Sequence, residues 1–286
     1  MRKILVLGAR GMAGHVMAEY LAQKSEYDVI RCARNAATPD TITLDVTDFG
    51  RVEGVLRDRR PDVVANCIGL LVQASEDRVD RAILINSYLP HFLSRLGKKY
   101  GFELIHISTD CVFSGDRGGY SEDAFRDGDT PYARTKALGE VINDSDLTLR
   151  TSIIGPELKQ DGTGLLHWFL MQKGKINAYT KAYWSGVTTL ELAKVVDHCI
   201  NRPVTGLVHL TMSQKISKFD LLTECQKVWN HDQVQIFPDE GHACDKSLVS
   251  HRTDLPFQLP PSYSAMLSEM RDFMIQHRDW YAHYPH

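Results

Sequence analysis

An apolar segment that runs straight into a glycine turn and then a helix constrains this chain more than any other feature. The segment KILVL at 3–7 is apolar without alternation, as in a strand that is covered on both faces in a parallel sheet. Gly8, Gly11 and Gly14 follow at once, and a helical pattern then runs to about Lys24. Glycines in such a turn let the backbone approach a pyrophosphate at the helix N-terminus. The segment therefore predicts a dinucleotide-binding strand–turn–helix unit.

Apolar strand patterns and helical patterns keep alternating through the first half of the chain. Further strands are expected at 27–32, 41–46, 62–69, 103–107 and 147–152, and helices at 48–60, 79–100 and from 131. Such alternation implies right-handed crossovers and a parallel sheet, with ligands beyond the carboxyl ends of the strands. Gly8, Arg34, Asp45, Gly69 and Thr109 all lie at those ends. We therefore predict an α/β, Rossmann-type doubly wound parallel sheet, with its site on one rim.

The alternation weakens beyond residue 155. Helices are expected at 163–173, 188–201, 217–229 and 262–276, and a late strand at 206–210. The segment 238–261 is interpreted as irregular, and the tail 280–286, with its two histidines, as mobile. We divide the chain into residues 1–155 and a smaller region at 156–286, with segments near 180–235 returning to the Rossmann core.

Composition excludes several classes of protein. An apolar content of 43%, a charged content of 24% and a net charge of −3 give no reason to expect nucleic acid or a membrane as partner. The amino-terminal apolar run meets a glycine turn instead of a cleavage site, so we expect no signal peptide. The six cysteines are scattered without a Cys-x-x-Cys pair, which favours a reducing, cytoplasmic location. The scattered histidines and carboxylates predict no metal site.

Arginines follow the second predicted strand. Arg31 and Arg34 lie where the adenosine ribose of a dinucleotide is expected, and arginine at that place suits a 2′-phosphate. Arg10, in the glycine turn, can close on the same phosphate. The alternative is that these are ordinary surface arginines. The pattern predicts NADPH as cofactor, with NADH possible.

The segment Pro131–Lys136 carries a candidate proton donor. If it opens a helix, Tyr132 and Lys136 lie one turn apart on one face. A phenol has a pKa near ~10, and an ammonium beside it lowers that pKa. The pair can then exchange a proton with a carbonyl or carbinol oxygen. Tyr20 and Lys24 share this spacing, so it is the surroundings that distinguish Tyr132.

Four stretches together resemble one known family. They are Gly8-x-x-Gly11-x-x-Gly14, Ser108-Thr109-Asp110, Tyr132-x-x-x-Lys136 and Arg150-Thr151-Ser152. In this order the chain resembles the extended short-chain dehydrogenases/reductases, and among them the dTDP-4-dehydrorhamnose reductase-like group. The later segment 186–193 also resembles that group.

The resemblance implies roles for individual residues. Thr109 would orient the substrate oxygen, Tyr132 would protonate it as hydride arrives from the nicotinamide, and Lys136 would lower the tyrosine pKa and hold the nicotinamide ribose. The cofactor is expected to contact Gly8, Arg10, Gly11, Met12, Gly14, Arg31, Arg34, Asp45, Val46, Cys67, Ile68, Gly69, Asn86, Ser108, Tyr132 and Lys136. The substrate is expected to contact Thr109, Asp110, Val112, Tyr132, Trp184 and Arg252.

The family also implies a function. We expect an NAD(P)H-dependent reductase of a nucleotide-linked 4-keto-6-deoxy sugar, dTDP- or UDP-linked, in polysaccharide or glycan precursor biosynthesis. Residues 156–286 would form the substrate-binding lobe, and the protein would be a monomer or a homodimer.

The sequence departs from the family in places, and two alternatives follow. His15 and Val16 replace a glutamate that joins a metal-linked dimer in several members, so activity is expected without a divalent metal although Glu191 is present. Ile153 replaces a common aromatic residue. Cys111 lies where related epimerase-reductases carry an epimerising cysteine, which leaves an epimerase-reductase as one alternative. A non-catalytic regulatory subunit, like the β subunit of methionine adenosyltransferase, is the other.

Overall fold

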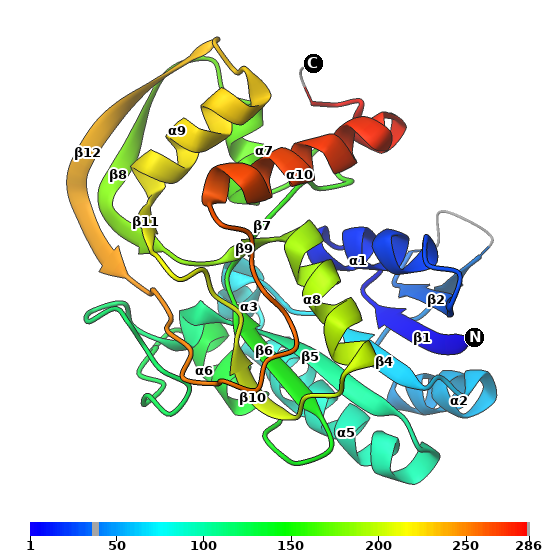
Figure 1. Cartoon of the computed structure of the whole chain (residues 1–286). Coiled ribbons are helices and arrows are strands. Elements are labelled where there is room, and N and C mark those ends of the chain that lie inside the picture. The colour runs from blue at the N-terminus through cyan, green and yellow to red at the C-terminus, as the bar shows by residue number, and fades with distance from the viewer. Residues whose placement is uncertain (36–39, 285–286) are drawn as a thin grey trace.

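The computed structural model describes residues 1–35 and 40–284. Its larger sheet has seven parallel strands in the order β10-β6-β5-β4-β1-β2-β3 (Figure 1). The strands are β1 (Arg2–Leu7), β2 (Tyr27–Ala33), β3 (Thr41–Thr43), β4 (Val63–Asn66), β5 (Glu103–Thr109), β6 (Leu147–Thr151) and β10 (Gly206–His209). The order runs outward in both directions from β1 and β4, which confirms the predicted Rossmann-type doubly wound sheet.

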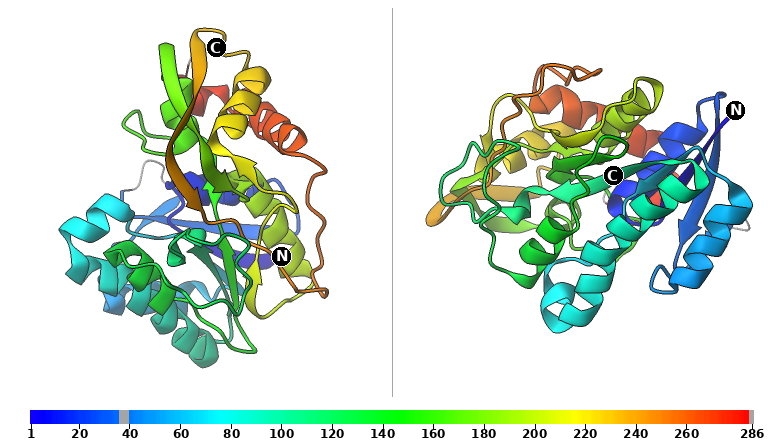
Figure 2. Two further views of the ribbon diagram at one scale, coloured as in Figure 1. Left: turned by 90° about the vertical axis from the view of Figure 1, so that its left-hand side faces the viewer. Right: turned by 90° about the horizontal axis from the view of Figure 1, so that it is seen from below.

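Helices cover both faces of this sheet (Figures 1 and 2). The helices before residue 205 are α1 (Met12–Ala22), α2 (Phe49–Arg59), α3 (Val72–Asp77), α4 (Val79–Ala82), α5 (Leu89–Tyr100), α6 (Pro131–Leu138), α7 (Leu165–Leu170) and α8 (Thr189–Asn201). Strand β1 explains the arrangement, because Ile4 and Val6 enter the core that includes α1 and α8, whereas Leu5 and Leu7 enter the core beneath α2 and α5. A strand buried on both faces accordingly reads as a continuous apolar run.

A second, smaller sheet lies apart from the first and has the order β11-β8-β12 (Figure 1). It consists of β8 (Gly174–Trp184), β11 (Ile216–Ser217) and β12 (Val234–Asp245). Helices α9 (Lys218–Trp229) and α10 (Tyr263–Gln276) lie beside it, and α9 contacts both long strands. Short strands β7 (Ile153–Ile154) and β9 (Val187–Thr188) pair where the chain passes between the two sheets.

Strand β12 corrects the expectation of irregular structure from Pro238 onward, because it extends to Asp245. Proline has no backbone N–H to donate, so it is tolerated only where a strand forms the edge of its sheet, as β12 does. Strand β8 was not predicted either. Its inward positions include Ala178 and Ala182, whose small side chains give only a weak alternating pattern.

The carboxyl-terminal tail is packed against the molecule as far as Tyr284, which corrects its interpretation as mobile. The turn η3 (Arg278–Tyr281) follows α10, and the side chains of Tyr281 and Tyr284 are buried. The Tyr281 hydroxyl lies 2.8 Å from Nε2 of His15 in α1, and the Tyr284 hydroxyl lies 2.9 Å from Nδ1 of His167 in α7. Residues 285–286 lie outside the described part.

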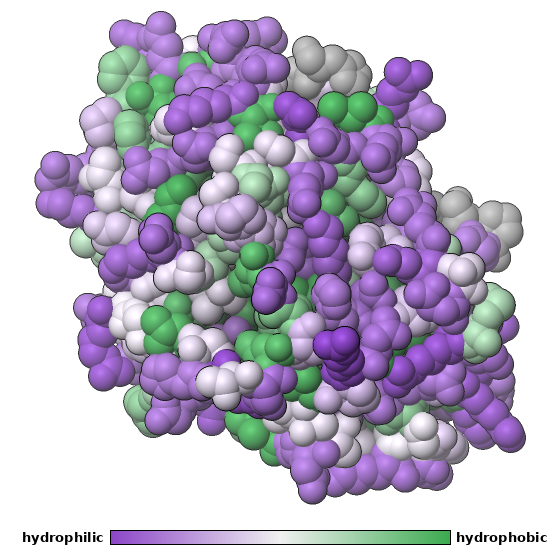
Figure 3. Space-filling view, viewed as in Figure 1, coloured by the Kyte–Doolittle hydropathy of each residue, from purple (hydrophilic) through white to green (hydrophobic). Residues whose placement is uncertain are grey.

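The surface seen in Figure 3 mixes polar and apolar side chains without one dominant apolar face. Within residues 1–35 and 40–284, no helix combines the length and apolar character that crossing a membrane requires.

Candidate active site

The glycine turn after β1 is built for close approach of backbones. Gly8 has a φ of 80°, a conformation that favours glycine, and its carbonyl accepts a 2.8 Å hydrogen bond from the N–H of Gly11. A Cβ on Gly14 would lie 2.2 Å from the Gly8 oxygen, so α1 can pack on the turn only because residue 14 lacks one. Met12 begins α1 just beyond the exposed Gly11. The turn therefore presents the N-terminus of a helix at the rim, as dinucleotide phosphate sites require.

Two of the three arginines that were predicted to contact the cofactor, Arg10 and Arg34, lie at this rim. The N–H groups of Gly8 and Ala9 both donate to the Cys32 carbonyl, so the segments carrying Arg10 and Arg34 are neighbours. Both arginine side chains are exposed.

Arg31 is engaged elsewhere, because its guanidinium forms ion pairs with Glu19 at 3.4 Å and Asp40 at 3.5 Å. The charge of Arg31 is therefore already matched by carboxylates within the protein.

Asp45 lies just past β3 and is exposed, whereas Val46 is buried. The backbone N–H and hydroxyl of Thr47 lower the pKa of Asp45, and the charge of Arg34 acts in the same direction. Because Ala33 pairs with Thr43, the end of β3 lies beside the segment that carries Arg34.

The turn after β4 faces the glycine turn from the other side. A Cβ on Gly8 would lie 3.0 Å from Cγ1 of Ile68 and 3.4 Å from the Cys67 carbonyl. Gly69 in this turn is exposed. Burial raises the pKa of the Cys67 thiol to about 12, although the charge of Lys136 opposes this. This turn therefore lies between the glycine turn and Lys136.

Asn86 is fully buried and positions neighbouring segments. The predicted helix 79–100 is in fact α4, the π-helix η1 (Ile83–Tyr88) and α5, and Asn86 lies in η1. Its Oδ1 accepts from the Leu70 N–H at 2.7 Å, and its Nδ2 donates to Oγ1 of Thr135 at 3.2 Å. Asn86 thus ties the turn after β4 to helix α6.

Helix α6 presents Tyr132 and Lys136 one turn apart. Thr130 caps the helix by accepting from the Ala133 N–H at 3.1 Å, and Pro131 follows at the first helical position. Lys136 is buried, and its Nζ donates to the Ile107 carbonyl at 2.8 Å. Burial lowers the pKa of Lys136 to about 8, while the charge of Glu140 opposes that shift.

The pKa of Tyr132 differs from the sequence-based expectation. Burial raises it, Cys111 and Asp110 raise it further, and the Thr109 hydroxyl lowers it. The Lys136 ammonium donates to the Ile107 carbonyl, and the lowering of the Tyr132 pKa that the sequence predicted is not found. Tyr132 is therefore held in its protonated form.

The end of β5 carries the residues that lie next to Tyr132. Thr109 donates to Oδ1 of Asp110 at 3.2 Å and accepts from the Cys111 N–H at 3.1 Å, at the start of the turn η2 (Asp110–Val112). Burial raises the pKa of the Cys111 thiol to about 12. Thr109, Asp110, Cys111 and Tyr132 therefore form one cluster.

Sequence reasoning missed two buried groups under this cluster. Nε2 of His106 lies 3.5 Å from the Lys136 ammonium, and burial holds the pKa of His106 well below its usual range. Glu140 accepts a 2.7 Å hydrogen bond from Ser108, which turns that predicted cofactor residue inward. The sequence carried no local signal for Glu140, because this residue lies two positions beyond the end of α6.

Three predicted substrate residues are not brought to the open rim. Val112 is fully buried in a cluster with Phe113, and Trp184 is buried with its ring 5.7 Å from that of Tyr263. The Arg252 guanidinium donates to the carbonyls of Thr205 and Leu207, and it pairs with Asp254 at 2.6 Å.

Arg252 therefore lies at the amino end of β10, whereas the site lies at the carboxyl ends of the strands.

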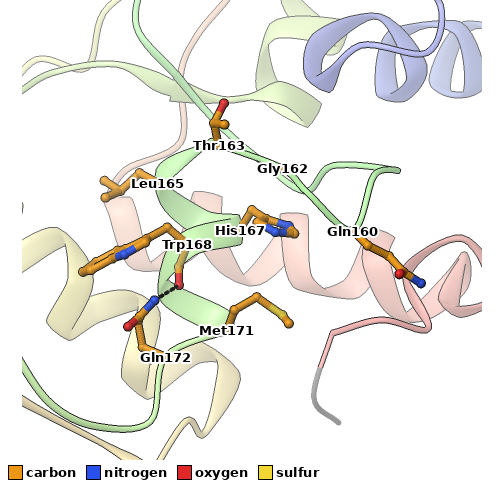
Figure 4. Close-up of a pocket in the computed structure, with 8 residues that line it drawn as sticks. All are labelled: Gln160, Gly162, Thr163, Leu165, His167, Trp168, Met171 and Gln172. Atoms are coloured by element: carbon orange, nitrogen blue, oxygen red, sulfur yellow. Dashed lines mark hydrogen bonds between the residues drawn. The ribbon is translucent and has the colours of Figure 1, made fainter. Parts of the chain in front are cut away.

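An open pocket of ≈ 610 Å³ lies over α7 (Figure 4), and Tyr132 is not among the residues that line it. His167 and Trp168 point to opposite sides of the helix there. A Cβ on Gly164, in the loop beside this pocket, would lie 3.1 Å from Sδ of Met12. The loop before α7 thus reaches the glycine turn, although the pocket itself contains none of the predicted site residues.

A Rossmann sheet with threonine, tyrosine and lysine clustered at its carboxyl rim defines an extended short-chain dehydrogenase/reductase. More narrowly, the chain belongs to the family described as RmlD substrate binding domain, which matches residues 1–284. The resemblance drawn from the four sequence motifs is thereby confirmed.

Individual relatives and one solved structure are similar to this chain. A probable dTDP-4,6-dihydroxy-2-methyloxan-3-one 4-ketoreductase from Streptomyces antibioticus is 28% identical over 258 residues, covering 84% of this chain and 81% of that protein. The NADP complex of dTDP-4-dehydrorhamnose reductase from Bacillus anthracis superposes with a TM-score of 0.82 at 22% identity, covering 96% and 99% of the two chains. Methionine adenosyltransferase 2 subunit beta from Xenopus laevis is 28% identical over 140 residues, which are 49% of this chain and 42% of that protein.

Proposed function

We propose that this protein is an NADPH-dependent reductase of a nucleotide-linked 4-keto-6-deoxy sugar, with dTDP or UDP as the nucleotide. The observation that carries the proposal is the cluster of Thr109, Tyr132 and Lys136 at the rim, adjoining the glycine turn through Cys67. The Streptomyces antibioticus relative, named as a dTDP-sugar ketoreductase, supports this substrate class.

The residues present fit the cofactor. The exposed backbone at Gly11 and the crowded contact of Gly14 with Gly8 suit the diphosphate, and Arg10 and Arg34 suit a 2′-phosphate. NADPH, when bound, supplies the hydride for the carbonyl carbon. Lys136 would hold the nicotinamide ribose.

In this proposal, residues of the protein supply the proton for the reduction. The raised pKa of Tyr132 keeps its phenol protonated at neutral pH, which is the form that donates to the carbonyl oxygen during reduction. Thr109 would donate a hydrogen bond to the same oxygen. The ammonium of Lys136 would then stabilise the phenolate that Tyr132 leaves, because the two residues lie one turn apart on α6. The net change converts C=O to CH–OH.

The test is a panel of 4-keto-6-deoxy sugars linked to dTDP, UDP, GDP and CDP. Each is mixed with the protein and NADPH, and loss of the reduced nicotinamide absorbance is followed. Turnover with a dTDP- or UDP-linked sugar is expected. Turnover confined to GDP- or CDP-linked sugars, or none at all, would reject the proposal.

An epimerase-reductase is less well supported, because a pKa of about 12 leaves Cys111 protonated and unsuited to act as a base. Deuterium uptake from solvent at C3 or C5 of the sugar, abolished by Cys111→Ala, would favour this alternative.

The similarity to methionine adenosyltransferase 2 subunit beta supports a regulatory subunit as a second candidate. Binding of NADPH without turnover on any member of the panel would favour it.

A further inference from the structure

Two lysines near the catalytic cluster lack the partners that other sheltered lysines have. Lys24, Lys136 and Lys194 are shielded from solvent, and each donates a hydrogen bond or forms an ion pair. Lys218 and Lys246 are also partly shielded, yet within the described residues neither makes a hydrogen bond or an ion pair. Within the described residues no carboxylate forms an ion pair with either ammonium, which leaves both available to an anionic ligand.

Lys218 is the first residue of α9. Its Nζ lies 5.5 Å from the centre of the Trp184 ring, which forms a floor beneath it. Burial lowers the pKa of Lys218, while the charge of Asp110 opposes the shift. The N-terminus of α9 adds positive potential at the same place.

Lys246 follows β12 and approaches from the other side. A Cβ on Gly115, close after the turn η2, would lie 3.0 Å from its Cγ. Burial raises the pKa of Asp110, and the charges of Lys218 and Lys246 oppose that shift. The charges of both lysines therefore act on Asp110.

Lys215 provides a contrast in the same lobe, because it is ion-paired with Asp245 and lies over the ring of Tyr183. Its charge is already matched within the protein. It therefore offers a control for substitutions at the two unpaired lysines.

We propose that Lys218 and Lys246 form a cationic subsite that binds the diphosphate of the sugar nucleotide. The proposal rests on the reductase function above, in which Thr109 and Tyr132 hold the sugar carbonyl. The diphosphate then extends toward the lobe, and lysine ammonium groups are effective point-charge partners for phosphate. The cofactor diphosphate has its own site at the glycine turn. These lysines take the place that was expected for Arg252.

Calorimetric titration of the NADP⁺-saturated protein with dTDP and with UDP tests the subsite. Lys218→Gln and Lys246→Gln should each raise the Kd of the nucleoside diphosphate by ~10-fold or more, since each removes a hydrogen bond to a charged group. Lys218→Arg should restore most of the binding because it keeps the charge. Lys215→Gln should bind like the wild type, and the NADPH Kd should be unchanged in every variant.

Three results would overturn the proposal. The first is an unchanged Kd for dTDP and UDP in both glutamine variants, even if their thermal stability falls. The lysines would then serve only to offset the negative charge of Asp110. The second is an equal loss of NADPH binding, which would assign the lysines to the cofactor. The third is a wild-type protein that binds neither nucleotide.

The proposed reductase is judged separately. If dTDP binds and its binding depends on the two lysines, but no 4-keto sugar is reduced, the subsite is supported and the reductase function is rejected. If a sugar nucleotide is reduced and its KM is unchanged in Lys218→Gln and Lys246→Gln, the reductase function is supported and the subsite is rejected.

Discussion

The guanidinium of Arg150 binds both carboxylate oxygens of Glu140 directly beneath the catalytic cluster. Nε lies 2.7 Å from Oε1 and Nη2 lies 2.6 Å from Oε2, and both side chains are buried. Ser108 donates to the same carboxylate. The pair therefore joins β6 to the segment just after α6 and, through Ser108, to β5, close to the helix that carries Tyr132.

Removing one partner of this pair should destabilise the fold strongly. Burial favours the neutral form of Glu140, but the hydrogen bonds from Arg150, Ser108 and Arg126 outweigh it and hold the pKa of Glu140 low. Glu140→Gln would leave Arg150 without its counter-charge, so the free energy of unfolding should fall by about 3–5 kcal/mol. Denaturant titration measures this.

The double variant Glu140→Leu/Arg150→Met should be more stable than Glu140→Gln, because no unpaired charge stays buried. A loss below 1 kcal/mol in Glu140→Gln, on the order of an exposed pair, would contradict the account.

Lys136 should reduce the stability of the protein while serving catalysis. Because burial lowers its pKa from 10.5 to about 8, its charged form costs roughly 3 kcal/mol of folding free energy at neutral pH. Lys136→Met should therefore raise the free energy of unfolding by a similar amount at pH 7, and should also abolish most activity and weaken NADPH binding.

The pH dependence of this gain has a definite sign. Below a pH of about 8, Lys136 is protonated in both states and the cost is full. Between about 8 and 10.5 the unfolded chain binds the proton and the folded protein does not, so wild-type stability rises with pH. The advantage of Lys136→Met should shrink over this range, and an advantage that grows with pH would refute the assignment.

NADPH should be preferred over NADH by at least ~10-fold in kcat/KM, because each charge-assisted contact to a 2′-phosphate contributes ~1.5–3 kcal/mol. Arg10 and Arg34 are the exposed candidates for those contacts. Arg34→Ala should lower the preference mainly through the KM for NADPH. Arg31→Ala is the matched control, since Arg31 is ion-paired with Glu19 and Asp40. Equal efficiency with both cofactors, unaffected by Arg34→Ala, would exclude this role.

Activity should survive removal of divalent metal. Among the residues that the structure describes, no group of three or more His, Cys, Asp or Glu side chains is placed to hold a metal ion. His15 instead contacts Gly11 and Tyr281. Prolonged dialysis against EDTA should leave the initial rate within error, and a loss that magnesium restores would count against this prediction.

Local signals in the sequence were enough to place the rim of the site. The glycine turn and the capped start of α6 depend on neighbouring residues, so their spacing predicted them. Tertiary contacts decided the rest. The tail is ordered by Tyr281 contacting His15, a residue 266 positions away. The pKa of Tyr132 depends on burial by distant segments. Neither effect leaves a local pattern.

Strand β12 and the position of Arg252 also could not be predicted from local sequence patterns. A proline and several polar residues obscured the strand, because an edge strand tolerates them. Arg252 was assigned to the substrate by resemblance, but the carbonyls that bind it come from the turn before β10 and from β10 itself. Only the folded chain brings those segments together.

The central claim is that Tyr132 donates the proton. Tyr132→Phe removes only a hydroxyl, so folding and the NADPH Kd should change little. Because the loss falls on the transition state, kcat should drop by ~10²–10⁴. Tyr20→Phe is the internal control, since Tyr20 has the same spacing to a lysine but lies on α1, with Lys24 over its ring.

The most direct measurement is kcat of Tyr132→Phe beside Tyr20→Phe, on a sugar nucleotide that the wild type reduces, with NADPH binding measured in the same samples. The account predicts a loss of ~10²-fold or more in Tyr132→Phe alone, with NADPH binding intact. Near-normal turnover in Tyr132→Phe, or equal damage in Tyr20→Phe, would contradict it.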